Sequence, residues 1–341
     1  MSAGIVLLYF VYIAVDFLIP LPIGTKSLEI EIPKGATFRQ AIEILEREKL
    51  IRDRSVFLLI GRISGLHRKI RAGYYSVYGS MSPLDIFLML KKGQIVEHEI
   101  TVVEGDSLRE ISEKLAVKGI INDEDFSNLT VRKDFLEAYH IDAPSCEGYI
   151  FPETYRIPKG MNPEEAIGMM INKMRENYSA ELRQRTAALG LSEREVLALA
   201  SIIEKEAATD DERPLVSAVY HNRLRKKMRL QADPTSVYGI KASGERITGS
   251  DLKRKTPYNT YVITGLPPGP IASPGIKSIR AALYPADVQY IYFVSNNDGT
   301  HTFSVTSEQH LSAVASYREK KRLKAADKKE SGNGKQKQEN P

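Results

Sequence analysis

The sequence predicts an α+β protein with an apolar N-terminal segment, a repeated region and a larger mixed domain. An apolar run occupies residues 5–19, and a segment that begins near residue 32 recurs seventy positions later. From about residue 146, helical periodicity alternates with loops rich in Pro and Gly, without a regular strand–helix–strand repeat. This mixture is typical of the α+β class. The 341 residues are enough for two domains.

The N-terminal run, IVLLYFVYIAVDFLI, is interrupted only by Asp16 and is followed by Pro20 and Pro22. As a helix it would be roughly 22 Å long, slightly short of the ~20 residues that usually span a bilayer. It has no A-x-A cleavage site, which argues against a secretory signal. No Lys or Arg precedes it, so its orientation stays open. We expect a single membrane anchor over residues 1–23, with a buried N-terminal helix as the alternative.

The repeat aligns residues 32–57 with residues 102–126. Each copy predicts a short strand, a Gly turn, a Ser or Thr helix N-cap, an amphipathic helix and a second capped segment. The matched pairs include Gly35 with Gly105, Thr37 with Ser107 and Asp53 with Asp123. The pattern resembles the LysM module, which recognises N-acetylglucosamine polymers. Between the copies, residues 71–93 predict a hairpin and a helix that begins after Ser82-Pro83.

The C-terminal half predicts two long helices, two rigid loops and a hairpin. The helices are expected over 163–189 and 192–208, and the loops over 223–240 and 255–275. Residues 290–305 alternate apolar and polar side chains around Asn297-Asp298-Gly299, which is a β-hairpin signal.

The net charge of +5 is carried by the C-terminal tail, because residues 320–341 contain eight Lys or Arg and three Asp or Glu. The tail has few apolar residues, so we expect it to be disordered and expect no nucleic-acid partner; a nucleic-acid-binding arm is the alternative. The single cysteine, Cys146, excludes an internal disulfide and a multi-Cys metal site, and is expected to be a small packed thiol.

The motif search narrows the chemistry to carboxylates. The chain contains no phosphate-binding G-x-x-x-x-G-K-[ST], no G-x-S-x-G nucleophile elbow and no H-E-x-x-H zinc motif, and its six His are scattered. We therefore expect neither a metal nor a cofactor.

The candidate acid lies in ALASIIEKEAAT, residues 198–209. Ser192 and Glu195 form a capping box that starts the helix, and apolar side chains then occur on every side, which predicts a buried helix. Desolvation and the negative end of the helix dipole both disfavour a carboxylate there, so Glu204 is expected to keep its proton near neutral pH, as a general acid must. The alternative is a structural glutamate paired with Lys205 or with an Arg from residues 223–229. Glu206 lies about 160° away around the helix and is a structural charge or a neighbour of the site.

The loops that flank this helix are dense in neutral hydrogen-bonding and aromatic side chains on backbones stiffened by proline. Such groups suit sugar hydroxyls and acetamido groups, and rigid loops reduce the ordering cost of binding. Turn chemistry alone would explain the Pro and Gly residues. The candidate substrate-binding residues are Gln231, Asp233, Thr235, Tyr238, Asn259, Thr260 and Tyr261.

Four segments, taken together and in this order, resemble the MltG (YceG-like) family of endolytic murein transglycosylases. They are EGYIFPETY (147–155), LASIIEKEA (199–207), RLQADPTSVYG (229–239) and YNTYVITGLPPGPIASPG (258–275). The resemblance implies an anchor at 1–23, a LysM-like region at 24–145, a catalytic domain at 146–318 and a basic tail at 319–341. It implies a bacterial inner-membrane enzyme that faces the periplasm or outer wall, with peptidoglycan strands as substrate and peptidoglycan-synthesis enzymes as partners.

The resemblance also places the family's catalytic glutamate on Glu204. The implied reaction cleaves the β-1,4 bond between N-acetylmuramic acid and N-acetylglucosamine within strands and leaves 1,6-anhydro ends. One carboxyl suffices, because the nucleophile is the substrate's own C6 hydroxyl. Two alternatives stay open: a glycan-binding scaffold that does not cleave, and a lysozyme-type hydrolase with Glu153 or Asp233 as a second carboxylate.

Overall fold

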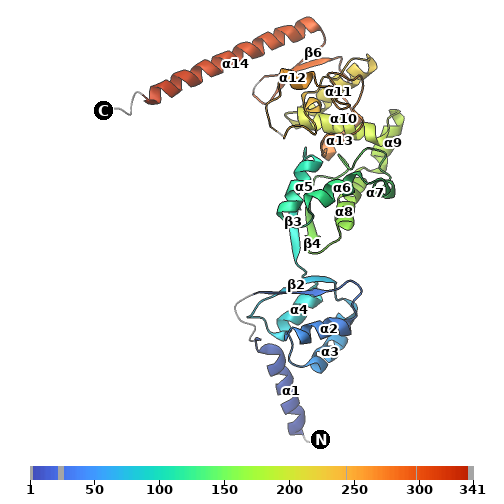
Figure 1. Cartoon of the computed structure of the whole chain (residues 1–341), viewed down its shortest axis with the longest axis vertical. Coiled ribbons are helices and arrows are strands. Elements are labelled where there is room, and N and C mark those ends of the chain that lie inside the picture. Colours follow the sequence, from blue (N-terminus) through green and yellow to red (C-terminus); the bar gives the residue numbers. More distant parts are fainter. Residues whose placement is uncertain (1–2, 22–26, 243, 297, 337–341) are drawn as a thin grey trace. The chain divides into compact units, whose positions relative to one another are not determined.

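The computed structural model describes residues 3–21, 27–242, 244–296 and 298–336, and divides into two compact units (Figure 1). Unit 1 contains residues 1–100 and 155–162, and unit 2 contains 101–154 and 163–341. This division differs from the predicted one, because residues 102–126, which were aligned as the second copy of the repeat, belong to the unit that holds Glu204. Residues of the 267–275 loop hold that copy in place: the Gly105 amide donates to the Ser273 carbonyl (2.8 Å), and the Ser273 amide donates to the Asp106 carbonyl (2.7 Å).

Unit 1 is built around a two-stranded antiparallel sheet covered by helices. Strand β1 (Leu28–Ile32) pairs with β2 (Gly73–Val77), with Leu28 opposite Val77. Unit 1 also contains the helices α2 (Phe38–Arg47), α3 (Arg54–Ile63), η1 (Leu66–Arg68) and α4 (Pro83–Lys92). The hairpin expected within 71–93 is wrong, since β2 pairs with the distant β1; the helix after Ser82-Pro83 is confirmed, with Ser82 as its N-cap.

Helix α1 (Ala3–Leu18) covers most of the predicted anchor, whose residues 1–2 and 22–23 lie outside the described part. Among the described residues, no helix is both long and apolar enough to cross a membrane. The last turn of α1 packs into unit 1, where the Phe17 ring lies 5.5 Å from that of Phe57. The Arg52 guanidinium fixes this end by donating to the carbonyls of Asp16, Ile19 and Pro20.

The two copies of the repeat have the same local structure. The first runs β1–α2–α3–β2, and the second runs β3 (Glu97–Thr101), α5 (Leu108–Val117), α6 (Asp123–Val131) and, after α7 (Lys133–Ala138), β4 (Thr154–Pro158). The predicted N-caps Thr37 and Ser107 both form capping boxes. Gly35 and Gly105 have φ values of 83° and 84°, the left-handed region that favours glycine. The order strand, turn, capped helix, second helix is therefore confirmed in both copies.

Unit 2 is mainly helical and centres on α10 (Glu193–Glu206), in which residues 196–203 are all buried. The predicted capping box of Ser192 and Glu195 and the predicted burial of this helix are both confirmed. The helix expected over 163–189 is instead two helices, α8 (Pro163–Asn177) and α9 (Ala180–Ala188), because Ser179 caps a new helix. The remaining helices are η2 (Asp210–Glu212), α11 (Arg213–Arg225), η3 (Asp233–Ser236), α12 (Gly249–Leu252) and α13 (Ile276–Leu283).

The C-terminal part contains the predicted hairpin and a long helix. Strands β5 (Tyr292–Ser295) and β6 (His301–Ser304) pair antiparallel, with Asn297 of the predicted turn outside the described residues. Helix α14 (Ser307–Gln336) follows, so the tail over 319–336 is helical rather than disordered as expected. Its many Lys, Glu and Ala residues are good helix formers, so a charged segment with few apolar residues can still be helical.

Candidate active site

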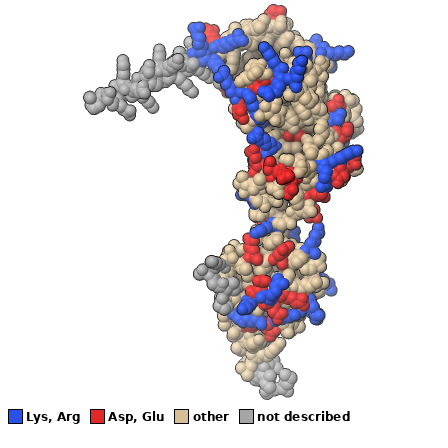
Figure 2. Space-filling view, in the orientation of Figure 1, with Lys and Arg blue, Asp and Glu red and all other residues tan. Residues whose placement is uncertain are grey.

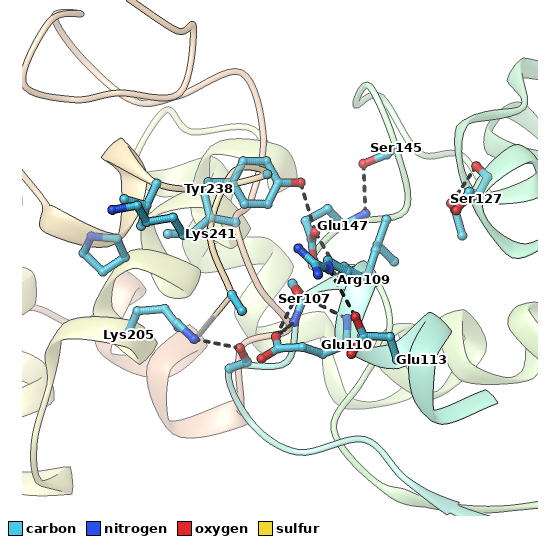
Figure 3. Close-up of a pocket in the computed structure, with 18 of the residues that line it drawn as sticks. Ser107, Arg109, Glu110, Glu113, Ser127, Ser145, Glu147, Lys205, Tyr238 and Lys241 are labelled. Carbon is cyan, nitrogen blue, oxygen red and sulfur yellow. Dashed lines mark hydrogen bonds and ion pairs between the residues drawn. The ribbon is translucent and has the colours of Figure 1, made fainter. Parts of the chain in front are cut away.

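A cavity of about 1190 Å³ in unit 2 has the end of α10 on its lining (Figure 3). One wall is α5, with its N-cap Ser107 and with Arg109 and Glu113, and the facing wall is the segment from Pro234 to Ile247. A second cavity of about 580 Å³ is lined by residues 101–104 and 152–154. Glu104 and Glu204 line both cavities, so the Glu204 carboxyl lies where the two meet.

The Glu204 carboxyl has two hydrogen-bond donors. Its side chain is only 5% exposed, and Oε1 accepts from Arg213 Nη1 at 2.8 Å while Oε2 accepts from the Gly275 amide at 2.9 Å. The expectation of an acid surrounded only by apolar side chains is therefore wrong. The ion-pair partner is also neither Lys205 nor an Arg of 223–229. Each carboxylate oxygen has two lone pairs, so both oxygens keep a position for a proton or a ligand.

Two helix starts place the donors next to Glu204: Arg213 begins α11, and Gly275 directly precedes α13. Arg213 is the first residue of α11, which begins directly after η2, and its Nε also donates to Asp210 Oδ1 at 3.0 Å. A Cβ at position 275 would lie 2.0 Å from Glu104 Oε1, so a larger residue there would require the Glu104 side chain to move. Lys205 donates to the Gly105 carbonyl at 3.2 Å.

A second carboxyl, Glu147, also lines the larger cavity. It is 3% exposed and accepts from the Leu108 amide (3.1 and 3.2 Å to its two oxygens) and from the Tyr238 hydroxyl at 2.9 Å. Burial raises the pKa of Glu147 to about 7, against the lowering effect of these hydrogen bonds. Glu147 was part of a motif that the sequence analysis singled out, but its burial could not be read from the pattern.

Of the seven expected substrate-binding residues, Tyr238 lines the cavity. Its ring packs against Tyr258 with centroids 4.6 Å apart and planes tilted by 46°. Burial, with the nearby Glu147 charge, raises the pKa of Tyr238, so the hydroxyl is a hydrogen-bond donor at any physiological pH.

Three of the expected residues are fully buried and bonded to the protein. Thr235 and Thr260 join their hydroxyls at 2.8 Å, and the Ala232 amide donates to Thr260 Oγ1 at 2.9 Å. The Asn259 side-chain amide donates to three backbone carbonyls, including that of Arg254 at 2.7 Å. These contacts fix the two loops against each other. Direct contact of these three side chains with a glycan stays a prediction.

Of the other three expected residues, Asp233 and Tyr261 lie beside Glu206, and the backbone of Gln231 bonds to that of Thr260. The Tyr261 hydroxyl donates to Asp233, the Asp233 amide donates to Glu206 Oε1 at 3.1 Å, and the Gln231 amide donates to the Thr260 carbonyl at 3.1 Å. Glu206 is partly exposed as a residue, but burial around its carboxyl group, followed by the charge of Asp233, raises its pKa to about 8. None of these four residues lines the two cavities, so the binding role of Gln231, Asp233 and Tyr261 also stays a prediction.

The charges around the larger cavity are mostly negative. Acidic side chains gather over α5 in the space-filling view (Figure 2). The lining contains seven acidic and three basic side chains: Glu104, Glu110, Glu113, Asp123, Glu147, Glu204 and Glu245 against Arg109, Lys205 and Lys241. Such a site disfavours phosphorylated ligands and suits neutral polar ones.

These geometric features agree with the sequence comparison. The sequence model of the YceG-like family matches residues 30–316, which include α5, both cavities and all of α10. The chain belongs to the YceG-like family. A YceG-like protein from Listeria monocytogenes with a crystal structure is 31% identical, with a TM-score of 0.59; the match covers 84% of this chain and 98% of that one.

Two curated relatives of this YceG-like chain carry the name endolytic murein transglycosylase. The Bacillus subtilis protein is 32% identical over 311 residues, which is 85% of each chain. The Streptococcus pneumoniae protein is 28% identical over 343 residues, and the match covers 91% of this chain but 62% of the pneumococcal one.

Proposed function

We propose that this YceG-like chain is an endolytic murein transglycosylase. It cleaves the β-1,4 bond between N-acetylmuramic acid and N-acetylglucosamine inside peptidoglycan strands and leaves 1,6-anhydro ends. The named relatives support this activity. The structural observation that carries it is the position of Glu204 on the lining of two cavities, because an enzyme that cuts within a strand needs room for sugars on both sides of its acid.

Glu204 would act first as an acid and then as a base. Its proton passes to the glycosidic oxygen, the bond from that oxygen to C1 of N-acetylmuramic acid breaks, and positive charge develops at C1. The C6 hydroxyl of the same sugar then bonds to C1, and its proton returns to Glu204. No water is consumed, so the reaction does not need a second carboxylate.

Arg213 and the Gly275 amide are expected to serve the second half of this cycle. Both donate to the Glu204 carboxyl, and donors of this kind stabilise the anion that remains once the proton has left. They also hold the carboxyl in one orientation at the junction of the cavities, which is the positioning that a proton transfer requires.

The assignment of Glu204 is tested by replacing it with Gln, which keeps the shape and removes the acid. Glu204→Gln should abolish release of 1,6-anhydro products from purified peptidoglycan, a loss of at least about a hundredfold for a general acid. Glu206→Gln is the matched control, because it removes a carboxyl from the same turn but lies off both cavity linings. Full activity of Glu204→Gln, or strand binding by wild type without new ends, would contradict the proposal.

A lysozyme-type hydrolase is the second candidate, because Glu153 shares the smaller cavity with Glu204. Asp233, the other expected partner carboxylate, does not line it. The Glu153 side chain is 46% exposed and lies 3.9 Å from Lys173 Nζ. Hydrolysis would give ends heavier by one water than anhydro ends, so mass spectrometry of the products separates the two reactions.

We also propose that α1 contributes to a membrane anchor and that the rest of the chain lies outside the cytoplasmic membrane, in contact with peptidoglycan and its synthesis enzymes. The exposed apolar side chains of α1 support the first point, with Leu7 and Leu8 exposed by 65% and 70%. The β–α–α–β order of both copies supports LysM-like glycan binding. Protease added to intact spheroplasts should digest unit 2; protection of unit 2 would contradict this location.

A further inference from the structure

Glu147 is a buried acid that the proposed reaction does not use. It is 3% exposed, yet it lies on the lining of the cavity that would receive the glycan. A buried carboxyl is costly unless its oxygens are bonded, so its partners indicate what it does. Those partners come from the two facing walls of the cavity.

One partner, Leu108, belongs to α5, and the other, Tyr238, belongs to the facing segment and points its hydroxyl toward Glu147 (Figure 3). The Leu108 amide, in the first turn of α5, donates to both carboxylate oxygens at 3.1 and 3.2 Å. The Tyr238 hydroxyl donates to Oε2 at 2.9 Å from the segment after η3. A single carboxylate therefore joins two walls whose donors, Leu108 and Tyr238, are 130 positions apart in the chain.

The turn that carries Glu147 is fixed in place. The Cys146 amide donates to the Thr130 carbonyl at 2.9 Å, and the Tyr149 amide donates to the Cys146 carbonyl at 2.9 Å. Gly148 has a φ of 76°, and a Cβ there would lie 2.3 Å from Pro270 Cβ. Any side chain at position 148 would push the turn away, so Glu147 is a rigid support.

We propose that Glu147 is a positioning residue for glycan binding: it ties the Tyr238 hydroxyl to the first turn of α5 and so fixes the Tyr238 ring as a sugar platform. The inference rests on the proposed function for the identity of the ligand. An aromatic ring whose position is already fixed offers its face to the C–H groups of a pyranose with little further ordering cost. Here Tyr258 supports the ring and Glu147 holds its hydroxyl.

The position of Glu147 also makes this support sensitive to pH. An ionised carboxylate accepts from both donors, whereas a protonated one carries its own O–H toward them. With the pKa of Glu147 raised to about 7, chiefly by burial, binding should tighten as the pH rises through neutrality. The titratable groups whose charges couple to Glu147 are Glu110 on α5, Tyr238, Tyr258 and the adjacent Cys146.

The test measures affinity for purified uncrosslinked glycan strands in a full-length Glu204→Gln background, where binding is separated from cleavage. Adding Tyr238→Phe removes only the hydroxyl, and adding Glu147→Gln replaces an acceptor by a donor. Each should weaken binding roughly tenfold, the size of a lost hydrogen bond to a charged group. Combining them should weaken binding no further, because both break the same contact. Glu137→Gln, which changes an exposed carboxyl on α7, should leave affinity unchanged.

If Glu147 only capped the first turn of α5, glycan affinity would not depend on its protonation. The pH dependence of binding therefore distinguishes the proposed role from a purely structural one. The Glu204→Gln parent should bind strands several-fold more tightly at pH 8 than at pH 6, and both added substitutions should remove this difference. Unchanged affinity in Tyr238→Phe, or effects that multiply in the combined variant, would overturn the proposal. If wild type releases no anhydro ends but the affinity pattern holds, the proposed function fails and the role of Glu147 stands.

Discussion

The two copies of the repeat share one local fold but differ in what their turns touch. Gly35 and Gly105 occupy the same position with nearly the same φ. A Cβ at Gly35 would meet nothing within 4 Å, whereas one at Gly105 would lie 3.5 Å from Lys205 Cδ and 3.9 Å from Glu204 Cγ. The difference shows that the repeated pattern specifies the local backbone structure of both copies. Only the turn of the second copy lies against the side chains of Glu204 and Lys205.

The same substitution in both turns tests whether the second turn contributes to activity. Gly35→Val and Gly105→Val should each cost about 1–2 kcal/mol in the free energy of unfolding, because a β-branched residue disfavours the left-handed region. Gly105→Val should also lower transglycosylase activity by roughly tenfold or more, because its methyl groups would extend from a Cβ that already contacts Lys205 and Glu204 and should shift these side chains. Thermal melts measure the first effect, and product release from peptidoglycan measures the second. Equal activity in the two variants would show that the second turn, like the first, has only a structural role.

A smaller effect concerns the buried carboxyls of unit 2. The pKa values of Glu206 and Glu147 are raised from 4.5 to about 8 and about 7. Between about pH 4.5 and 8 the folded chain therefore holds protons that the unfolded chain releases, so stability falls as the pH rises and levels off above 8. Glu206→Gln should flatten the decline in melting temperature from pH 5 to pH 8. A steeper decline in this variant would contradict the assigned direction.

The sequence pattern predicted the features that depend on neighbouring residues. The caps at Thr37, Ser107 and Ser192, the burial of α10 and the hairpin at 290–305 all follow from local spacing and were confirmed. Contacts between distant segments were missed, because periodicity carries no information about them. Arg213, which directly follows η2, donates to the Glu204 carboxyl. Glu147 accepts from the Leu108 amide and from the Tyr238 hydroxyl.

The predicted substrate-binding residues in the loops also show that sequence patterns do not reveal contacts between distant segments. Asn259 and Thr260 were chosen because amides and hydroxyls on rigid loops suit a sugar, yet in the structure they bond to backbone and to Thr235. The same types of polar residue stabilise loops and bind ligands, so residue type alone does not distinguish the two roles. Only Tyr238, whose ring reaches the cavity lining, is distinguished by its position.

The central claim is that one carboxyl, Glu204, performs both proton transfers at the junction of the two cavities. Mass analysis of the products of wild type and Glu204→Gln on the same purified peptidoglycan tests it most directly. The account predicts 1,6-anhydro ends from wild type and none from Glu204→Gln, with Glu206→Gln like wild type. Anhydro ends from Glu204→Gln at the wild-type rate, or wild-type ends heavier by one water, would contradict it.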